Sequence, residues 1–402
     1  MININVNNQK LGDIAPYEFV ERKGVGHPDT ICDMIAERAS MLYSQYWNEN
    51  YGRIAHHWFD KVMLIGGESV IEFGYGKIVK PYKIIFAGKC AKSYNNKAIP
   101  LYSILKQACV EILSNVLTGF IAEEHITIID ELVDYSGAGR LNARYRPQRN
   151  EDLIKIGETD QVSNDCNLLS AYAPLSVMEQ IVLFIEGYLN GNEFKNNYND
   201  TGWDVKVVGV REGNAYSLLV NMPLLASKIT SLNHYFQRKE MIVEAINKKL
   251  EEHFPIKVEL NLNPQDDSGH IYLTVLGSAA DTGDVGVVGR GNRINGLITP
   301  MRTMSIEAPN GKNPIDHTGK IYGVLAKKIA AELYEEYKTP VEVHIFTAKE
   351  SKLQEPDVIN VDFYCQTISE ENKQTVKQKI QHMLSEVHQI TNILIFDGVV
   401  MC

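Results

Sequence analysis

Helical and β-prone segments alternate along this chain of 402 residues, and no Pro-, Gly- or Ser-rich linker separates them. From residue 28 to about residue 47, apolar side chains recur at helical spacing, and a proline at the start suits the first position of a helix. Shorter β-prone stretches cover residues 61–65, 82–87 and 126–129. Because helices alternate with short strands rather than in strict βαβ units, we predict an α+β fold in which helices cover sheets.

The second half of the chain continues this alternation. Ser176 and Glu179 form a capping-box pattern before the apolar run at 177–189, which predicts a helix there. Further helices are predicted at 241–253, 320–337 and 370–390. Extended segments are predicted at 205–210, 217–221, 257–262, 270–275, 341–346, 357–364 and 392–396. The length suggests two or three domains, and without a linker these must be interleaved or tightly packed.

The composition excludes several classes of protein. The chain carries 40 Lys and Arg against 50 Asp and Glu, a net charge of −10, so it does not bind nucleic acid over its whole surface. The six cysteines form no CxxC pair, so neither a disulfide framework nor a zinc site has support. No apolar run approaches about 18 residues and the first residues carry no targeting pattern, so we predict a cytoplasmic protein without membrane contact. An anionic ligand therefore needs a local cluster of cations.

A glycine-dense run at 283–296 reads GDVGVVGRGNRING. Glycine lets backbone N–H groups approach a ligand closely, and Arg290 and Arg293 offer planar guanidinium groups that match phosphate oxygens. The run therefore predicts a phosphate-binding cradle, with a Gly-rich pair of turns and solvated arginines as the alternative. Its spacing is neither that of a Walker loop nor that of a Rossmann unit.

The mouth of the first predicted helix carries His27 and acidic side chains in the segment GVGHPDTICD. Asp29, Asp33 and Glu37 lie four residues apart and therefore share one face of that helix. Carboxylates of this kind suit Mg²⁺, which commonly bridges to substrate phosphates. The alternative is a helix start that is stabilised by acidic side chains near its N-terminus.

Two lysines are further candidates. Asp204 and Lys206 alternate on a predicted strand, so they point to the same side, and Lys312 lies in the loop GKNP. The alternative interpretation is that each lysine is an ordinary exposed surface charge.

Four motifs together resemble the S-adenosylmethionine synthetases, and specifically the archaeal-type branch of about this length. They are GHPDTICD at 26–33, YAPLS at 172–176, GDVGVVGRGNRINGLITPMR at 283–302 and GKNP at 311–314. Their order and separation match that family from about residue 14 to the C-terminal region, and the long third motif is too specific to arise by chance.

The resemblance implies a pseudo-threefold α+β fold with three similar domains, each a sheet with helices on one face, built from non-consecutive segments. The implied domains combine residues 1–13 with 177–276, 14–145 with 277–310, and 146–176 with 311–402. The resemblance also implies a homodimer with its active sites between the subunits.

In the reaction that the resemblance implies, the sulfur of L-methionine attacks C5′ of ATP and expels the whole triphosphate, which is then hydrolysed to pyrophosphate and phosphate. Two Mg²⁺ ions are implied, and K⁺ helps many members of the family. The matching motifs imply that His27 lies against the departing triphosphate, that Asp29 binds Mg²⁺, and that Lys206, Arg290 and Lys312 hold phosphates. The further positions implied in binding ATP or its phosphates are Asp165, Asp204 and Asp284, of which Asp284 would contact ATP or the amino acid. Arg293 has no counterpart in the bacterial branch, but its spacing lets it serve as a further phosphate ligand.

The chain departs from the family where the family binds the nucleophile. Trp58 and Phe59 replace two small polar residues, which predicts a bulkier and more apolar pocket wall. Asp316 is the nearest match to a lysine that binds the methionine carboxylate in bacterial members, so Arg140 could take over that carboxylate. Glu68 matches a glutamate that contacts methionine, which favours a substrate with an amine.

Two alternatives to a methionine adenosyltransferase stay open. A divergent relative could use ATP with another nucleophile, as an adenosyltransferase or a triphosphate-releasing enzyme. A non-catalytic ATP-binding paralogue is the second alternative, although the cationic and acidic positions assigned to the phosphates are all intact.

Overall fold

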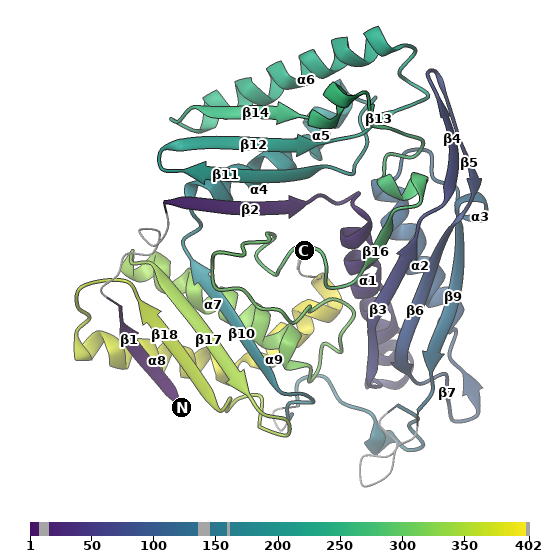
Figure 1. The fold of residues 1–402 in the computed structure, drawn as a ribbon. Helices are drawn as coiled ribbons and strands as arrows, with labels where there is room; N and C mark the ends of the chain where they lie inside the picture. Colours follow the sequence, from purple (N-terminus) through teal and green to yellow (C-terminus); the bar gives the residue numbers. More distant parts are fainter. Residues whose placement is uncertain (8–15, 136–144, 159–160, 399–402) are drawn as a thin grey trace.

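The computed structural model describes residues 1–7, 16–135, 145–158 and 161–398. Three four-stranded sheets, from segments far apart in the sequence, surround a central region of loops (Figure 1). Each sheet has its own hydrophobic core beneath the helices that cover it. The prediction of an α+β fold with helices covering sheets is confirmed.

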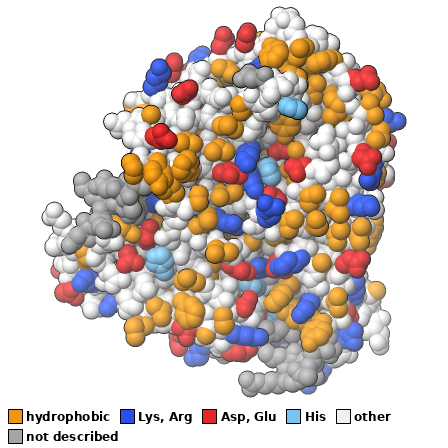
Figure 2. All heavy atoms as spheres, in the orientation of Figure 1, with side chains coloured by type: hydrophobic (Ala, Val, Ile, Leu, Met, Phe, Trp, Pro, Cys, Tyr) orange, Lys and Arg blue, Asp and Glu red, His pale blue; other side chains and the backbone are white. Residues whose placement is uncertain are grey.

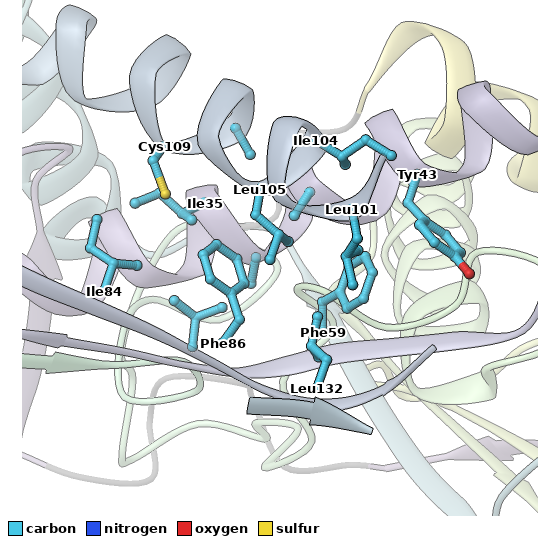
Figure 3. Packing of buried hydrophobic residues seen from close by; sticks show 14 of the residues in the cluster. Ile35, Tyr43, Phe59, Ile84, Phe86, Leu101, Ile104, Leu105, Cys109 and Leu132 are labelled. Atoms are coloured by element: carbon cyan, nitrogen blue, oxygen red, sulfur yellow. The ribbon is translucent and has the colours of Figure 1, made fainter. Parts of the chain in front are cut away.

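The first sheet has the strand order β16 (Val285–Val287), β3 (His57–Ile65), β6 (Tyr82–Cys90) and β9 (Ile126–Val133). Strand β3 pairs antiparallel with both of its neighbours, and β9 runs parallel to β6. Helices α1 (Pro28–Tyr51) and α2 (Leu101–Val116) cover one face (Figure 3). Proline at N1 and Gly52 at the left-handed C-cap set the bounds of α1, as the sequence predicts for its start.

The second sheet has the order β14 (Val258–Leu262), β12 (Ala215–Asn221), β11 (Lys206–Glu212) and β2 (Tyr17–Lys23). Helices α4 (Val177–Leu189) and α6 (Leu232–His253) pack on it. The predicted capping box is confirmed, because the Ser176 hydroxyl accepts from Glu179 N at 3.1 Å and Glu179 Oε2 accepts from Ser176 N at 2.6 Å.

The third sheet has the order β1 (Ile2–Val6), β18 (Val358–Phe363), β17 (Val341–Thr347) and β10 (Asn167–Ala173). Strand β1 runs parallel to β18, and the other pairs are antiparallel. Helices α7 (Thr318–Tyr337) and α8 (Glu370–Ser385) cover this sheet.

Shorter elements connect the sheets. They are the hairpin β4 (Glu68–Glu72) and β5 (Tyr75–Lys80), the pairs β7 (Ser93–Tyr94) with β8 (Lys97–Ala98) and β13 (Leu224–Leu225) with β15 (Leu273–Thr274), and the short helices α3 (Ala122–His125), α5 (Asn192–Asn197) and α9 (Val387–Asn392). Among the described residues no helix is both long and apolar enough to cross a membrane. The cytoplasmic location stays a prediction.

Two extended segments predicted from the sequence differ clearly from the structure. The extended segment predicted at 392–396 is wrong, because residues 393–397 form a wide helical turn after α9 in which Leu394 and Ile395 are buried. A short apolar run fits a buried helical turn as well as a strand, so periodicity alone does not separate them. The strand predicted at 270–275 shortens to the two residues of β15.

The division into three interleaved domains stays a prediction, but two strands pair differently from its grouping. Strand β1 lies beside β18 in the third sheet, whereas the prediction groups residues 1–13 with 177–276. Strand β2 lies beside β11 in the second sheet, whereas the prediction groups 14–145 with 277–310. The partner of an isolated short strand is set by long-range packing, which the local pattern does not record.

Candidate active site

One face of α1 holds two loops in place through three carboxylates. Asp29 Oδ1 accepts from Val287 N at 2.9 Å, and Asp33 Oδ1 accepts from Gly289 N at 3.0 Å. One turn further on, Glu37 Oε2 accepts from Gly311 N at 3.0 Å. The predicted acidic face is therefore present, and it binds backbone amides of the glycine-rich run and of the GKNP loop.

Glycine is required where this run crosses the start of α1. A Cβ on Gly286 would lie 2.0 Å from the carbonyl oxygen of Pro28 and 2.2 Å from its carbonyl carbon. Both atoms are backbone atoms of the first helical residue, which have no freedom to move aside. The missing side chain at position 286 lets the run lie directly on the helix.

We therefore expect Gly286→Ala to lower both the melting temperature and the enzymatic activity. Gly187 is the matched control, since it lies at an exposed position in the last turn of α4 and a Cβ there would meet nothing within 4 Å. Gly187→Ala should not lower stability, and should raise it by up to about 1 kcal/mol, because alanine has the higher helix propensity. Thermal unfolding of both variants checks this, and equal melting temperatures would contradict the proposed close contact.

Charged side chains gather where the N-terminus of α1, the end of β2 and the start of β11 meet. Lys23 Nζ donates to Asp29 Oδ2 at 2.8 Å and to the carbonyl oxygen of Arg290 at 2.7 Å. Lys23 and Lys206 are opposite each other in the β2–β11 ladder. Figure 2 shows basic, acidic and histidine side chains together in the middle of this face. Sequence analysis does not identify Lys23 as a site residue, because its place beside Lys206 depends on the register between two strands.

His27 is neutral at physiological pH. Burial is the main cause that lowers its pKa to about 4; Asp29 and Asp284 oppose this shift, and Lys23 and Lys206 add to it. His27 Nδ1 accepts a hydrogen bond from Asp29 N at 3.1 Å. The proton of the neutral ring is therefore on Nε2, which is left as a donor.

Asp204 anchors the turn that presents Asp284. It is 3% exposed, and its Oδ2 accepts from Ala279 N at 2.8 Å and from the Tyr272 hydroxyl at 3.4 Å. Burial, with a contribution from Asp284, raises the pKa of Asp204 to about 7. Asp284 itself is exposed beside the histidine, and it accepts a hydrogen bond from Val285 N.

A second charged cluster surrounds Lys312. Its ammonium group lies 3.2 Å from Asp60 Oδ2 and also pairs with Glu307. The carbonyl oxygen of Lys312 accepts from Ser40 Oγ at 3.2 Å. Ser40 follows Asp29 by 11 residues of α1, so at 1.5 Å per residue the point where the backbone of Lys312 contacts α1 lies about 16 Å along the helix from Asp29.

Two residues predicted for the nucleophile pocket lie beside this second cluster. Trp58 pairs with Lys312 through a backbone bridge, and its ring lies 6.2 Å from that of His317. Asp316 is buried; its Oδ1 accepts from Asn164 Nδ2 at 2.9 Å, and its Oδ2 lies 3.2 Å from His56 Nδ1.

Phe59 and Glu68 lie in other surroundings. The ring of Phe59 is fully buried between the first sheet and its helices, at a centroid distance of 5.2 Å from Tyr43 (Figure 3). Phe59 is therefore a core residue of the first sheet. Glu68 is exposed on the β4–β5 hairpin and pairs with Lys80 at 2.6 Å.

The remaining candidates are scattered around the two clusters. Arg290 is exposed on the glycine-rich run, whereas Arg293 turns inward and its Nη1 donates to the carbonyl oxygen of Gly289 at 2.9 Å. Asp165 is half-buried and accepts from Cys166 N at 2.8 Å. Arg140 lies outside the described residues.

This site fits a divalent cation that is bound partly by protein carboxylates and partly by phosphate oxygens. Within the described ranges no three or more His, Cys, Asp or Glu side chains form a metal cage. Asp29 and Asp284 both act electrostatically on His27 and so belong to one cluster. Mg²⁺ commonly takes one or two protein carboxylates and completes its shell with phosphate oxygens and water, so this donor set suits it.

Asp33 makes the stability of the protein depend on pH. Burial raises its pKa from 3.8 to about 7. In the unfolded chain the carboxyl group ionises near pH 4, whereas in the folded chain it keeps its proton up to about pH 7. The unfolded state therefore binds fewer protons across this window, and the contribution of Asp33 to stability falls as pH rises through it.

We expect the melting temperature of Asp33→Asn, relative to that of the unmodified protein, to be higher at pH 8 than at pH 5. The amide oxygen can still accept from Gly289 N and does not ionise. Thermal unfolding at both pH values checks this. A difference in melting temperature that stays constant across the range would contradict the raised pKa.

Cations, a neutral histidine and carboxylates lie together beside a glycine-rich run on an α+β fold, a combination of groups that suits a phosphate ligand. The chain belongs to the S-adenosylmethionine synthetase family, since the model of "S-adenosylmethionine synthetase (AdoMet synthetase)" matches residues 1–398. It is 35% identical over 412 residues to the S-adenosylmethionine synthase of Saccharolobus solfataricus, and the alignment covers 98% of each chain. It is 36% identical over 398 residues to that of Caldivirga maquilingensis, covering 94% of each. The predicted archaeal-type branch is confirmed, and the chain is an enzyme of the transferase class.

Proposed function

We propose that this enzyme forms S-adenosylmethionine from ATP and L-methionine. The sulfur attacks C5′ of ATP, the C5′–O bond breaks, and the triphosphate leaves and is hydrolysed to pyrophosphate and phosphate. The observation that carries the proposal is the cluster of Lys23, His27 and Lys206 beside the exposed Arg290. Negative charge builds on the leaving triphosphate, and fixed cations at that place favour the transition state.

The chain's own residues act by binding and by donating hydrogen bonds. Lys206 and Arg290 bind phosphate oxygens, Arg290 through its planar guanidinium group. His27 donates from Nε2 to a triphosphate oxygen, because its Nδ1 already accepts from the backbone. Asp204 supports the turn that carries Asp284 through its bond with Ala279 N. Arg293 stabilises the glycine-rich run through its hydrogen bond to the carbonyl oxygen of Gly289.

Mg²⁺ would be held by Asp29 and Asp284 together with the phosphates. When bound, the ion would neutralise part of the charge of the triphosphate. Lys23 Nζ already donates to Asp29 Oδ2 at 2.8 Å, so a cation lies at this carboxylate in the free enzyme. The use of two Mg²⁺ ions and the effect of K⁺ stay predictions.

We propose a homodimer in which a second copy covers the open faces of the sheets. Apolar side chains are exposed on these faces: Tyr17 and Phe19 on β2, and Leu168 and Phe346 as cross-strand neighbours on β10 and β17. Contiguous exposed apolar side chains mark association surfaces. Lys312 would then complete the phosphate site from the other subunit, which accounts for its distance from Asp29 along α1.

The second cluster supplies the proposed nucleophile pocket. Trp58 gives it an apolar wall, and Asp316 places a carboxylate, already bonded to Asn164, at its edge. Glu68 is proposed at the amino-acid end and Asp165 at the nucleotide on the resemblance. Arg140 is proposed at the amino-acid end because its cation could take over the carboxylate that a lysine binds in bacterial members.

Incubating the purified protein with ATP, Mg²⁺ and L-methionine tests the proposal. Mass spectrometry should detect the sulfonium product together with pyrophosphate and phosphate. Release of phosphates without the sulfonium would point to another nucleophile, and nucleotide binding without turnover would point to a non-catalytic paralogue. Either of these two results would overturn the proposed reaction.

A further inference from the structure

Lys89 on β6 is held by three aromatic rings. Its ammonium nitrogen lies 4.8 Å from the ring centroid of Tyr135, 5.5 Å from that of Trp58 and 5.8 Å from that of Tyr145. Within residues 1–7, 16–135, 145–158 and 161–398, no carboxylate pairs with this ammonium group. The side chain is only partly buried, so a ligand can reach it.

An irregularity of the first sheet creates this arrangement. The β3–β6 register shifts between Trp58 and Lys61, and Trp58 pairs directly with Lys89 across the strands. The neighbouring Gly88 has a φ of +144°, and a Cβ there would lie 2.0 Å from the carbonyl oxygen of Trp58. Bulges of this kind redirect side chains near functional sites, and here the indole lies over the ammonium group.

The indole of Trp58 also lacks an acceptor in the described part of the chain. Its Nε1 is buried and makes no hydrogen bond there. A buried donor without an acceptor is costly, so it indicates a group that is supplied from outside. The Lys89 ammonium group over the Trp58 ring and the buried N–H of the same indole therefore both lack a carboxylate or other acceptor in the described part of the chain, and Trp58 is bridged to Lys312.

We propose that Lys89, with the Trp58 N–H as a second donor, binds the carboxylate of the amino-acid substrate. The inference rests on the proposed function, and it adds Lys89 to the amino-acid end of the site, where Arg140 is also proposed. Asp316 cannot serve this purpose, because it is an acid and already bonds to Asn164. The aromatic rings hold the ammonium group in place through cation–π contacts, so it is already positioned for a carboxylate.

Kinetics of Lys89→Met test this proposal. Losing a charged hydrogen bond should raise KM for methionine by about 10- to 100-fold and leave KM for ATP unchanged. Methioninol lacks the carboxylate, so its KM should not change. Lys83 is exposed on the same strand, and Lys83→Met is the matched control that should behave like the unmodified enzyme. An unchanged KM for methionine, or an equal rise for both substrates, would overturn the proposal.

A binding measurement separates this inference from the proposed reaction. In ¹⁵N-tryptophan-labelled protein, the indole resonance that Trp58→Phe removes should shift on adding methionine with a non-hydrolysable ATP analogue. It should not shift with methioninol, nor in Lys89→Met. A shift in a protein that forms no sulfonium would support the carboxylate site and overturn the reaction. A resonance that does not move overturns the carboxylate site whatever the turnover.

Discussion

Replacing Lys320 by methionine should lower the free energy of unfolding by about 3–5 kcal/mol. Lys320 is 0% exposed, and its ammonium group contacts Glu37 Oε1 at 2.8 Å and Oε2 at 2.7 Å. Burial lowers the pKa of Lys320, and Glu37 opposes that shift. Without the lysine, the carboxylate of Glu37 stays buried with no cation, which costs far more than the pair itself contributes.

Urea unfolding followed by circular dichroism measures this loss. Lys328→Met on the same helix is the control, because Lys328 is exposed and lies 3.9 Å from Glu332; its loss should change stability by less than about 0.5 kcal/mol. Adding Glu37→Gln to Lys320→Met should restore part of the stability, since no unpaired charge then remains. A single variant as stable as the unmodified protein would contradict the buried pair.

Replacing Arg290 by alanine should lower kcat/KM for ATP by about 10²- to 10³-fold while the protein stays folded. The side chain is exposed, and the contact of this residue with Lys23 uses the backbone oxygen, which alanine keeps. The substitution therefore removes a cation that stabilises the leaving triphosphate and leaves the contacts that stabilise the fold.

Arg149→Ala is the control for a lost surface charge, because the Arg149 side chain is 73% exposed and pairs only with the neighbouring Asp152 at 3.6 Å in the described structure. Steady-state kinetics and thermal unfolding of both variants separate the two effects. Normal turnover by Arg290→Ala would show that the glycine-rich run does not bind the triphosphate.

Local sequence patterns predict the parts of this molecule whose structure is decided locally. The start of α1 follows from its proline, and the start of α4 follows from the capping box at Ser176. The spacing of Asp29, Asp33 and Glu37 predicts a shared face. Their partners, the amides of Val287, Gly289 and Gly311, lie more than 250 residues away, and no local pattern identifies them.

Long-range pairing decides the rest of the site. Lys23 joins Lys206 only through the register of β2 against β11, and Lys320 meets Glu37 only when α7 packs near α1. Trp58 stands out in the sequence as a departure from the family, but its contact with Lys89 depends on the bulge between β3 and β6. Such contacts arise from tertiary packing. The sequence therefore indicates what single residues can do chemically, but not which residues lie side by side.

Titration calorimetry of the full chain with a non-hydrolysable ATP analogue, with and without Mg²⁺, tests most directly whether this site binds the triphosphate. We expect saturable binding that needs Mg²⁺ in the unmodified protein and is strongly weakened in folded Arg290→Ala. Folded, unmodified protein that takes up no nucleotide in the presence of Mg²⁺ would contradict the proposed triphosphate site.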